Sequence, residues 1–483
     1  MSLKHILSGV FISCLLTACA GSGGTTVAEG GIGGSGISVG PITAFGSVWV
    51  NGVRYDVSGA EFVRDGVMVS GQGEYRIGEI VTVSGSVNTD RVTGKADRVV
   101  FNDALEGTVT SVSSAANELQ VLGQRVKVSS LTIFHGFALL ADLQPGNVVE
   151  ISGSPDSQGV INASSITLKQ SNFVSGVSEL EIKGRVESVN ASAQTFVLNS
   201  IRVDYSTAQL DLPGNQPVNG QYVEVKSMQP LQNNLLIAAK IELKDEQIMF
   251  AEGVELELEG RITLFRSSQD FAVNGVPVLT TTDTEFEYGT AADLKLDSVV
   301  EVEGIINASG VLLADEIAIR QSADAAEEVE LEGSVSAIDA AKQELTLLGN
   351  TVVVDNQTIL LDETSDRERS IRFTDLRVGN YLEVSGKMLA DGRILALKLS
   401  REDSEDGHLE VKGVCRDVNV SEGTLVIQGV TVMTDGNTEF ESDDESLSQQ
   451  QFFSRLVEGE TIVGAEGTAL GNNWIRAVKM EAD

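Results

Sequence analysis

The nonapeptide PGNVVEISG, residues Pro145–Gly153, carries an alternating apolar core between two glycines. Nearly the same stretch returns as VGNYLEVSG at Val378–Gly386 and as IGEIVTVSG at Ile77–Gly85. Such alternation is typical of a strand with one buried face, and glycines at strand ends favour turns and bulges. The pattern predicts that Glu150 points outward from the buried face. No Lys-Ser or Lys-Thr pair follows the glycines, so the stretch is not a phosphate-binding loop.

This nonapeptide is part of a longer repeat. The pattern Gly-x-x-Val-x-Val-x-Gly is degraded at Gly220–Ser227 and Asp297–Gly304, and it gains one residue near Gly459–Gly467. A strand-like start with an anchor glycine precedes the later copies. These glycines recur every 73 to 80 residues, at Gly107, Gly184, Gly260, Gly333 and Gly413. With a first copy from Ser38, six modules fill the chain and leave almost no room for an inserted catalytic domain.

Within a module, the sequence predicts about five strands separated by glycine turns. The Asn-Gly pairs after Val50 and Val273 tolerate positive φ and favour tight hairpins. A longer polar stretch such as Asp362–Arg377 follows the third strand and has room for a short helix. Five strands with an element between the third and fourth match the plan of an OB-fold, so we expect an all-β tandem array of small, antiparallel, OB-like barrels. A two-layer sandwich is the alternative.

The repeat boundaries divide the chain into eight segments. These are a signal peptide (1–18), a lipidated cysteine with a Gly/Ser-rich tether (19–37), and modules at 38–104, 105–178, 179–252, 253–326, 327–402 and 403–483.

The first residues indicate export. A short positive end and an apolar run lead to LTAC, Leu16–Cys19, which resembles the lipobox of bacterial lipoproteins. The resemblance implies that Cys19 carries lipid and that residues 1–18 are removed; an ordinary secretory signal is the alternative. A glycine-rich tether follows. Ala20 stands where an Asp would resemble an inner-membrane retention signal, so we expect the outer membrane, facing the periplasm or the cell surface.

Tandem modules behind a lipobox, with GGIGGSGISVGPITAFGSVWVNGVRYD at Gly30–Asp56, resemble the bacterial repeat family catalogued as domain of unknown function 5666. The resemblance covers the mature chain. It implies architecture and location, and no chemistry, because the family has no established activity.

The chain has a formal net charge of −36. Nucleic-acid binding needs clustered Lys and Arg, so we expect no nucleic-acid partner, and a membrane contact only through the lipid anchor. An envelope protein or a polysaccharide is the expected partner.

Reactive side chains are sparse. Cys415 falls at an inward strand position, where a free cysteine behaves as a small hydrophobe. His135 and His408 are the histidines that remain after cleavage, and both are expected to face solvent. They form neither a zinc site nor a triad with Cys415. We therefore expect no enzyme, no metal and no cofactor.

Two features leave binding open. The acidic runs Asp362–Asp366, Asp403–His408 and Glu441–Ser446 offer oxygen ligands for calcium, but none follows the EF-hand spacing, and solvated loops are the simpler reading. Trp49 alternates with inward residues, so an exposed indole there would suit a sugar ring or an interface.

The sequence thus favours a non-enzymatic, membrane-anchored lipoprotein that serves as an envelope spacer, structural element or adhesive binder. An oligosaccharide- or calcium-binding protein of the periplasm or cell surface is the alternative, and an enzyme is third.

Overall fold

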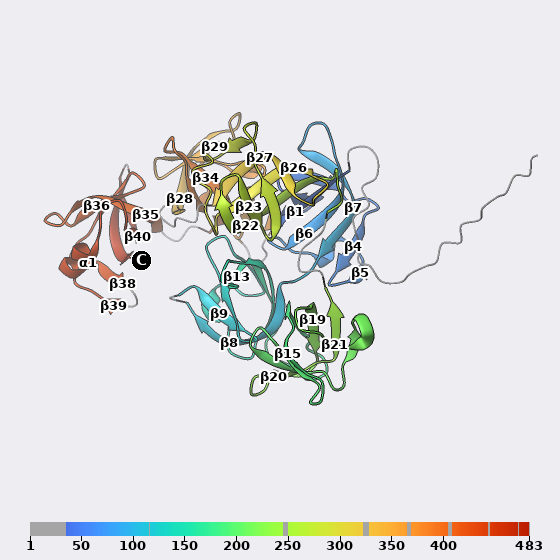
Figure 1. Cartoon of the computed structure of the whole chain (residues 1–483). Coiled ribbons are helices and arrows are strands. Elements are labelled where there is room, and N and C mark those ends of the chain that lie inside the picture. The colour runs from blue at the N-terminus through green and yellow to red at the C-terminus, as the bar shows by residue number, and fades with distance from the viewer. Residues whose placement is uncertain are drawn as a thin grey trace, which may run out of the picture.

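Six small β-barrels follow one another along the chain (Figure 1). The computed structural model describes residues 35–114, 116–244, 250–321, 328–364, 369–403, 408–442, 445–471 and 473–482. None of the helices in these ranges is long and apolar enough to cross a membrane. The expected signal peptide, Cys19 and most of the tether lie outside the described residues.

The first three barrels lie between residues 35 and 243. The first contains β1 (Ser35–Ala44), β2 (Val48–Val50), β3 (Val53–Asp56), β4 (Glu61–Arg64), β5 (Val67–Val69), β6 (Ile80–Val87) and β7 (Thr93–Phe101). The second contains β8 (Leu105–Ser113), β9 (Glu118–Val121), β10 (Gln124–Lys127), β11 (Ile133–His135), β12 (Val148–Pro155) and β13 (Ile161–Gln170). The third contains β14 (Leu180–Arg185), β15 (Glu187–Asn190), β16 (Thr195–Leu198), β17 (Ile201–Asp204), β18 (Gln209–Asp211), β19 (Tyr222–Ser227), β20 (Leu235–Ile237) and β21 (Lys240–Leu243).

The last three barrels lie between residues 255 and 482. The fourth contains β22 (Glu255–Ser267), β23 (Asp270–Val273), β24 (Val276–Leu279), β25 (Glu285–Glu287), β26 (Val299–Ile306) and β27 (Leu312–Gln321). The fifth contains β28 (Glu328–Asp339), β29 (Glu344–Leu347), β30 (Asn350–Val353), β31 (Ile359–Asp362), β32 (Arg369–Ser370), β33 (Tyr381–Met388) and β34 (Ile394–Glu402). The sixth contains β35 (His408–Asn419), β36 (Thr424–Ile427), β37 (Val430–Met433), β38 (Glu439–Ser442), β39 (Glu445–Ser446), α1 (Gln449–Arg455), β40 (Ile462–Gly471) and β41 (Trp474–Ala482).

Each barrel closes in the strand order of an OB-fold. In the first barrel β1 pairs with β2, β2 with β3, β3 with β7, β7 with β6, and β6 again with β1. The β3–β7 pair is parallel and the other four pairs are antiparallel. The element between the third and fourth strands begins with a short strand. A 3-10 turn follows it in the first, second, third and fifth barrels, and α1 follows it in the sixth. The expected tandem array of small OB-like barrels is confirmed.

The repeated motif has a separate structural reason for each of its glycines. Gly146 adopts φ 98°, which a side chain disfavours, in the turn before β12. Gly153 lies at a register shift between β12 and β13, where a β-carbon would collide with the carbonyl oxygen of Asn162. In the third barrel Ser227 replaces this second glycine, and its hydroxyl donates to the carbonyl of Ile237 across 2.7 Å. The motif is therefore a turn followed by a bulged strand, as the sequence predicts.

The Asn-Gly hairpin signal is also confirmed. Asn51 and Gly52 connect β2 to β3 with φ angles of 50° and 75°. Positive φ at both central residues defines a type I′ turn, whose twist matches that of the strands.

The first strand of a barrel leaves one edge open, and a second barrel covers it. In the first barrel, β6 pairs with residues 35–41 of β1 on one side. On the other side, β2 pairs with β1 only from Ile42 onward. The uncovered edge at Gly36–Val39 pairs in parallel with Glu255–Leu258 of β22. In the same way β8 pairs with β14, and β28 pairs with β35. Exposed strand edges promote aggregation, so this pairing removes a hazard that barrel closure alone leaves.

These pairs join the first barrel to the fourth, the second to the third, and the fifth to the sixth. Figure 1 shows the sixth barrel, in red, at one end of the molecule and the third, in green, beside the second. Apolar cores merge across the pairs, because Ile37 and Val39 of β1 pack in the core of the fourth barrel. A barrel of this size is only marginally able to bury a core alone, so shared burial stabilises both partners. The modules are thus packed domains rather than independent beads.

Packing between barrels corrects one sequence expectation. Glu150 does lie on the outer face of its barrel, but it is 3% exposed because the first barrel covers that face. It accepts from Lys169 across 2.6 Å and also contacts Arg64 of the first barrel. A neighbouring module takes the place of solvent at this face. The alternation of apolar and polar residues in one strand does not indicate such a contact.

Candidate functional site

A groove of about 1270 Å³ runs between the first, second and fifth barrels. One wall comes from β11 and the loop after it, and the other comes from β28, β32, β33 and β34 with Glu363 just after β31. The segments between the third and fourth strands of two barrels therefore build most of the site. These segments vary most from copy to copy, whereas the barrel strands repeat.

The first wall is aromatic. The rings of Phe134 and Phe137 stack with centroids 4.8 Å apart and an interplanar angle of 27°. Phe45 of the first barrel and His135 line the groove beside them. Leu139 is exposed at the end of this wall. The sequence IFHGF thus gathers three of the rings in a chain that has few aromatic residues.

The second wall is acidic. Its charged residues are Glu332, Glu363, Glu383, Glu402 and Asp403, together with Lys398 and Arg369. Burial, with hydrogen bonding to Glu363 and the charges around it, raises the pKa of Glu402 to about 8. Burial also raises the pKa of Glu383, and Lys398 partly offsets that effect. At neutral pH Glu402 therefore holds a proton, which it shares with Glu363, and the pair offers the groove carboxyl oxygens as acceptors.

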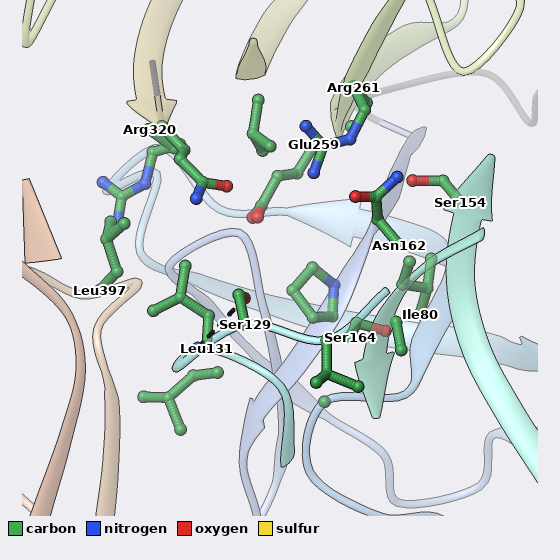
Figure 2. A pocket seen from close by; sticks show the side chains of 18 of the residues that line it. Ile80, Ser129, Leu131, Ser154, Asn162, Ser164, Glu259, Arg261, Arg320 and Leu397 are labelled. Carbon is green, nitrogen blue, oxygen red and sulfur yellow. Dashed lines mark hydrogen bonds between the residues drawn. The ribbon is translucent and has the colours of Figure 1, made fainter. Parts of the chain in front are cut away.

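A second, smaller hollow of about 420 Å³ lies where the first, second, fourth and fifth barrels meet (Figure 2). Glu259 and Arg261 of β22 line it, with Ser154 and Asn162 from the second barrel. The segment from residue 127 to residue 131 contributes to this cavity, and its continuation lines the groove.

One acidic cluster has the geometry of a metal site. Ligand oxygens of Asp65, Asp103 and Glu181 lie within 4.8 Å of one another. The ammonium of Lys183 lies 2.5 Å from both Asp103 Oδ1 and Glu181 Oε1, and Lys226 lies 2.7 Å from Glu181. The two lysines thus supply the positive charge that a cation would bring.

Two of the residues singled out in the sequence are placed differently from expectation. His135 does not face solvent: it is half-buried, and its Nε2 lies 2.8 Å from the carbonyl oxygen of Ile77. Burial lowers the pKa of His135 to about 4, so the ring is neutral at physiological pH. Trp49 is half-buried on β2 rather than fully exposed, and it lines neither hollow.

The predicted core position of Cys415 is confirmed, because its side chain is fully buried. The acidic runs differ from solvated loops in one respect. Asp362 is 1% exposed, with Arg401 Nη2 at 2.7 Å and Arg369 Nε at 2.6 Å. Two arginines therefore occupy the place of a calcium ion at Asp362. Residues 365–366, 404–407 and 443–444 of these runs lie outside the described residues.

Sequence reasoning missed the groove. Its aromatic and acidic walls belong to barrels that are distant in the chain, so no local pattern joins them. The cluster IFHGF was the available signal, since Phe134 and Phe137 are concentrated in a segment that other copies do not match. The residues that flank Glu363 and Glu402 in the sequence form no pattern that indicates a binding site.

Comparison with known proteins assigns a family. The family described as Domain of unknown function (DUF5666) matches residues 106–167, 183–242, 259–318, 332–400 and 412–481. No curated protein matches the chain. The solved structure named drosophila Unr CSD456 is similar at 13% identity over 46% of this chain and 97% of that chain, with a TM-score of 0.11. The five matches correspond to the second to sixth barrels and cover most of the chain, which therefore belongs to the DUF5666 family.

Proposed function

We propose that this chain is a non-enzymatic lipoprotein of the bacterial cell envelope that binds an oligosaccharide in the groove between its first, second and fifth barrels. The observation that carries the proposal is the stacked pair Phe134 and Phe137 facing a row of carboxyl groups. Aromatic faces pack against the apolar faces of sugar rings, and carboxyl groups hydrogen-bond to hydroxyls. Such a mixture of flat apolar surface and few polar groups is typical of ligand sites.

The charge of the groove limits the class of ligand that can bind there. Five carboxyl groups outnumber the two cations, Lys398 and Arg369, on the acidic wall, and Arg76 of the first barrel adds a third cation to the groove. With a net charge of −36 over the whole chain, a polyanionic polysaccharide would be repelled. The proposed ligand is therefore a neutral oligosaccharide. Glu402 and Glu363 share one proton, and the free carboxyl oxygens of the wall would accept from sugar hydroxyls.

The closest described pair of carboxyl groups on the acidic wall, Glu402 and Glu363, favours binding rather than hydrolysis. Glycosidases hold two carboxyl groups about 5–5.5 Å or about 6.5–9.5 Å apart, with the sugar bond between them. Glu402 and Glu363 instead share a hydrogen bond, so no sugar bond fits between them.

A glycan array tests the ligand. Wild-type protein is expected to retain neutral glycans, and Phe137→Ala is expected to lose them because stacking contributes about 1 kcal/mol or more. Trp49→Ala is the matched control, because Trp49 is an aromatic residue outside the groove. Equal loss in both variants, or no glycan retained by the wild type, would contradict the proposal.

The anchor has its own test. Labelled palmitate is expected to label wild-type protein in bacterial cells, and Cys19→Ala is expected to abolish the labelling and to release the protein from membranes. Several acyl chains on one cysteine would hold firmly, since each buried methylene contributes about 0.8 kcal/mol. Labelling that persists in Cys19→Ala would disprove the anchor without affecting the groove.

A further inference from the structure

The cavity at the meeting point of four barrels contains a charged residue without a partner. The second to sixth barrels each place a charged residue directly before the anchor glycine (Glu106, Lys183, Glu259, Glu332 and Lys412), and the first two of these are paired with an opposite charge. Glu106 lies 3.4 Å from Lys169, and Lys183 lies 2.5 Å from Asp103. Among the residues that the structure describes, Glu259 forms no hydrogen bond or ion pair, although Arg320 attracts it from farther away. Its carboxylate points into the cavity (Figure 2).

Glu259 is half-buried, and a partly desolvated carboxylate with no close ion pair is costly, because the lost hydration is not replaced. Burial accordingly raises the pKa of Glu259. Three cations line the cavity, Lys127, Arg261 and Arg320, and the two arginines donate to other acceptors. Arg320 donates to Asp355 across 2.6 Å, and Arg261 donates from Nη1 to the carbonyl of Asp297 across 2.5 Å. A positively charged group of a ligand would therefore be favourable in the cavity next to Glu259.

Arg261 provides a positive charge that can bind a negative group of a ligand. It stands two residues after Glu259 on β22 and therefore faces the same side of the strand. Its Nε is buried and has no hydrogen-bond partner. Arg261 forms no ion pair with Glu259, so a carboxylate and a guanidinium line one cavity without neutralising each other.

The remaining walls define what lies between the charged groups. Leu131, Ile359 and Leu397 form an apolar wall, and Figure 2 shows Leu131 and Leu397 on the side away from Asn162 and Ser154. The volume of about 420 Å³ is within the range of small-molecule sites. The site therefore combines acidic groups (Glu259, Asp297 and Glu328), basic groups (Lys127, Arg261 and Arg320), hydroxyl and amide groups and an apolar surface.

We propose that this cavity binds a small zwitterion with an apolar side chain, such as a free apolar amino acid or a short peptide. Its ammonium group would contact Glu259, its carboxylate would contact Arg261, and its side chain would pack on Leu131 and Leu397. This inference does not rest on the oligosaccharide site, which lies in the separate groove.

The test uses the full-length protein and five L-amino acids, namely leucine, isoleucine, valine, methionine and phenylalanine. At least one is expected to bind in calorimetry and to raise the melting temperature. The N-acetyl derivative and the amide of that amino acid, which each lack one charge, are expected to bind at least about tenfold more weakly. If none of the five binds at 10 mM, or if either derivative binds as tightly as the parent, the proposal is wrong.

Variants locate the binding. Glu259→Gln is isosteric and is expected to weaken binding at least about tenfold, and Arg261→Gln is expected to do the same. Glu255→Gln is the matched control, because Glu255 is an exposed glutamate on the same strand. If Glu259→Gln alters folding, Arg261→Gln decides the matter. Equal affinity in Glu255→Gln and both cavity variants would overturn the assignment, and Phe137→Ala is expected to keep full affinity.

Discussion

Arg320 of the fourth barrel donates from Nη1 to Oδ2 of Asp355 in the fifth barrel across 2.6 Å, and from Nη2 to Oδ1 across 3.4 Å. The guanidinium also lies over the ring of Tyr288, with 5.5 Å between its carbon and the ring centroid. Neither barrel contains both partners, so this two-pronged ion pair exists only when the barrels are packed together.

Arg320→Met is expected to lower the free energy of unfolding by about 3 kcal/mol, because it leaves Asp355 without its cation in a mostly buried place. Arg393→Met is the control, since Arg393 pairs with Asp391 and Glu344 at the surface, and a cost below about 1 kcal/mol is expected. Urea denaturation measures both. Equal losses would show that Arg320 does not hold the two barrels together.

The glycine that ends the motif is predicted to be irreplaceable in the sixth barrel. A β-carbon at Gly467 would collide with the carbonyl of Arg476 at the bulge between β40 and β41. Gly467→Ala is expected to cost about 3 kcal/mol, because the backbone must shift. Gly464→Ala, three residues earlier on the same strand, meets no atom within 4 Å and is expected to be nearly neutral. Fluorescence of Trp474 in a Trp49→Phe background follows the unfolding of this barrel.

The junction of the fifth and sixth barrels is predicted to weaken as pH rises. Glu410 lies opposite Glu332 on one side and Glu466 on the other. Burial, together with Glu330 and these neighbours, raises the pKa of Glu410 from 4.5 to about 8. Between these values the folded chain retains a proton that the unfolded chain releases, so stability is full below pH 4.5 and is lost as pH rises through 8.

The Glu410→Gln variant is expected to flatten this dependence between pH 5 and pH 9. Glu422→Gln, an exposed residue of the same barrel, is expected to leave it unchanged. The urea midpoint of the sixth barrel, read from Trp474, gives both profiles. A wild-type midpoint that rises with pH would contradict the assignment.

Cys415 is predicted to react with thiol reagents only when the sixth barrel opens. Its side chain is fully buried, and burial raises the pKa of its thiol. Labelling in native buffer is expected to be slow, and labelling in urea is expected to be complete. Mass spectrometry of peptides separates Cys415 from Cys14 and Cys19. Rapid native labelling of Cys415 would argue against its place in the core.

The sequence predicted the barrel because its determinants are local and repeated. Alternation in PGNVVEISG, positive φ at Asn51 and Gly52, and the spacing of anchor glycines each act within one module. The groove and the cavity were not predictable in this way. Glu402 and Phe137 line one groove, and Glu259 and Leu397 line one cavity, only because the modules pack together, and no pattern within one module indicates which other module covers it.

The same limit explains the misplaced residues. Glu150 and His135 are polar residues on outward strand positions, which predicts solvent for an isolated barrel. The first barrel covers both of them. By contrast Cys415 was placed correctly, because its burial depends only on its own barrel.

The pairing of β1 with β22 has a consequence for how the chain is made. The two strands meet across 219 residues, the separation of Ser38 and Glu257. At about 5–20 residues per second of synthesis, the edge of the first barrel waits roughly 10–45 s for its partner strand. During that time a bare row of backbone amides and carbonyls is available to other chains. A folding helper in the compartment that receives the chain would therefore act most usefully on its first barrel.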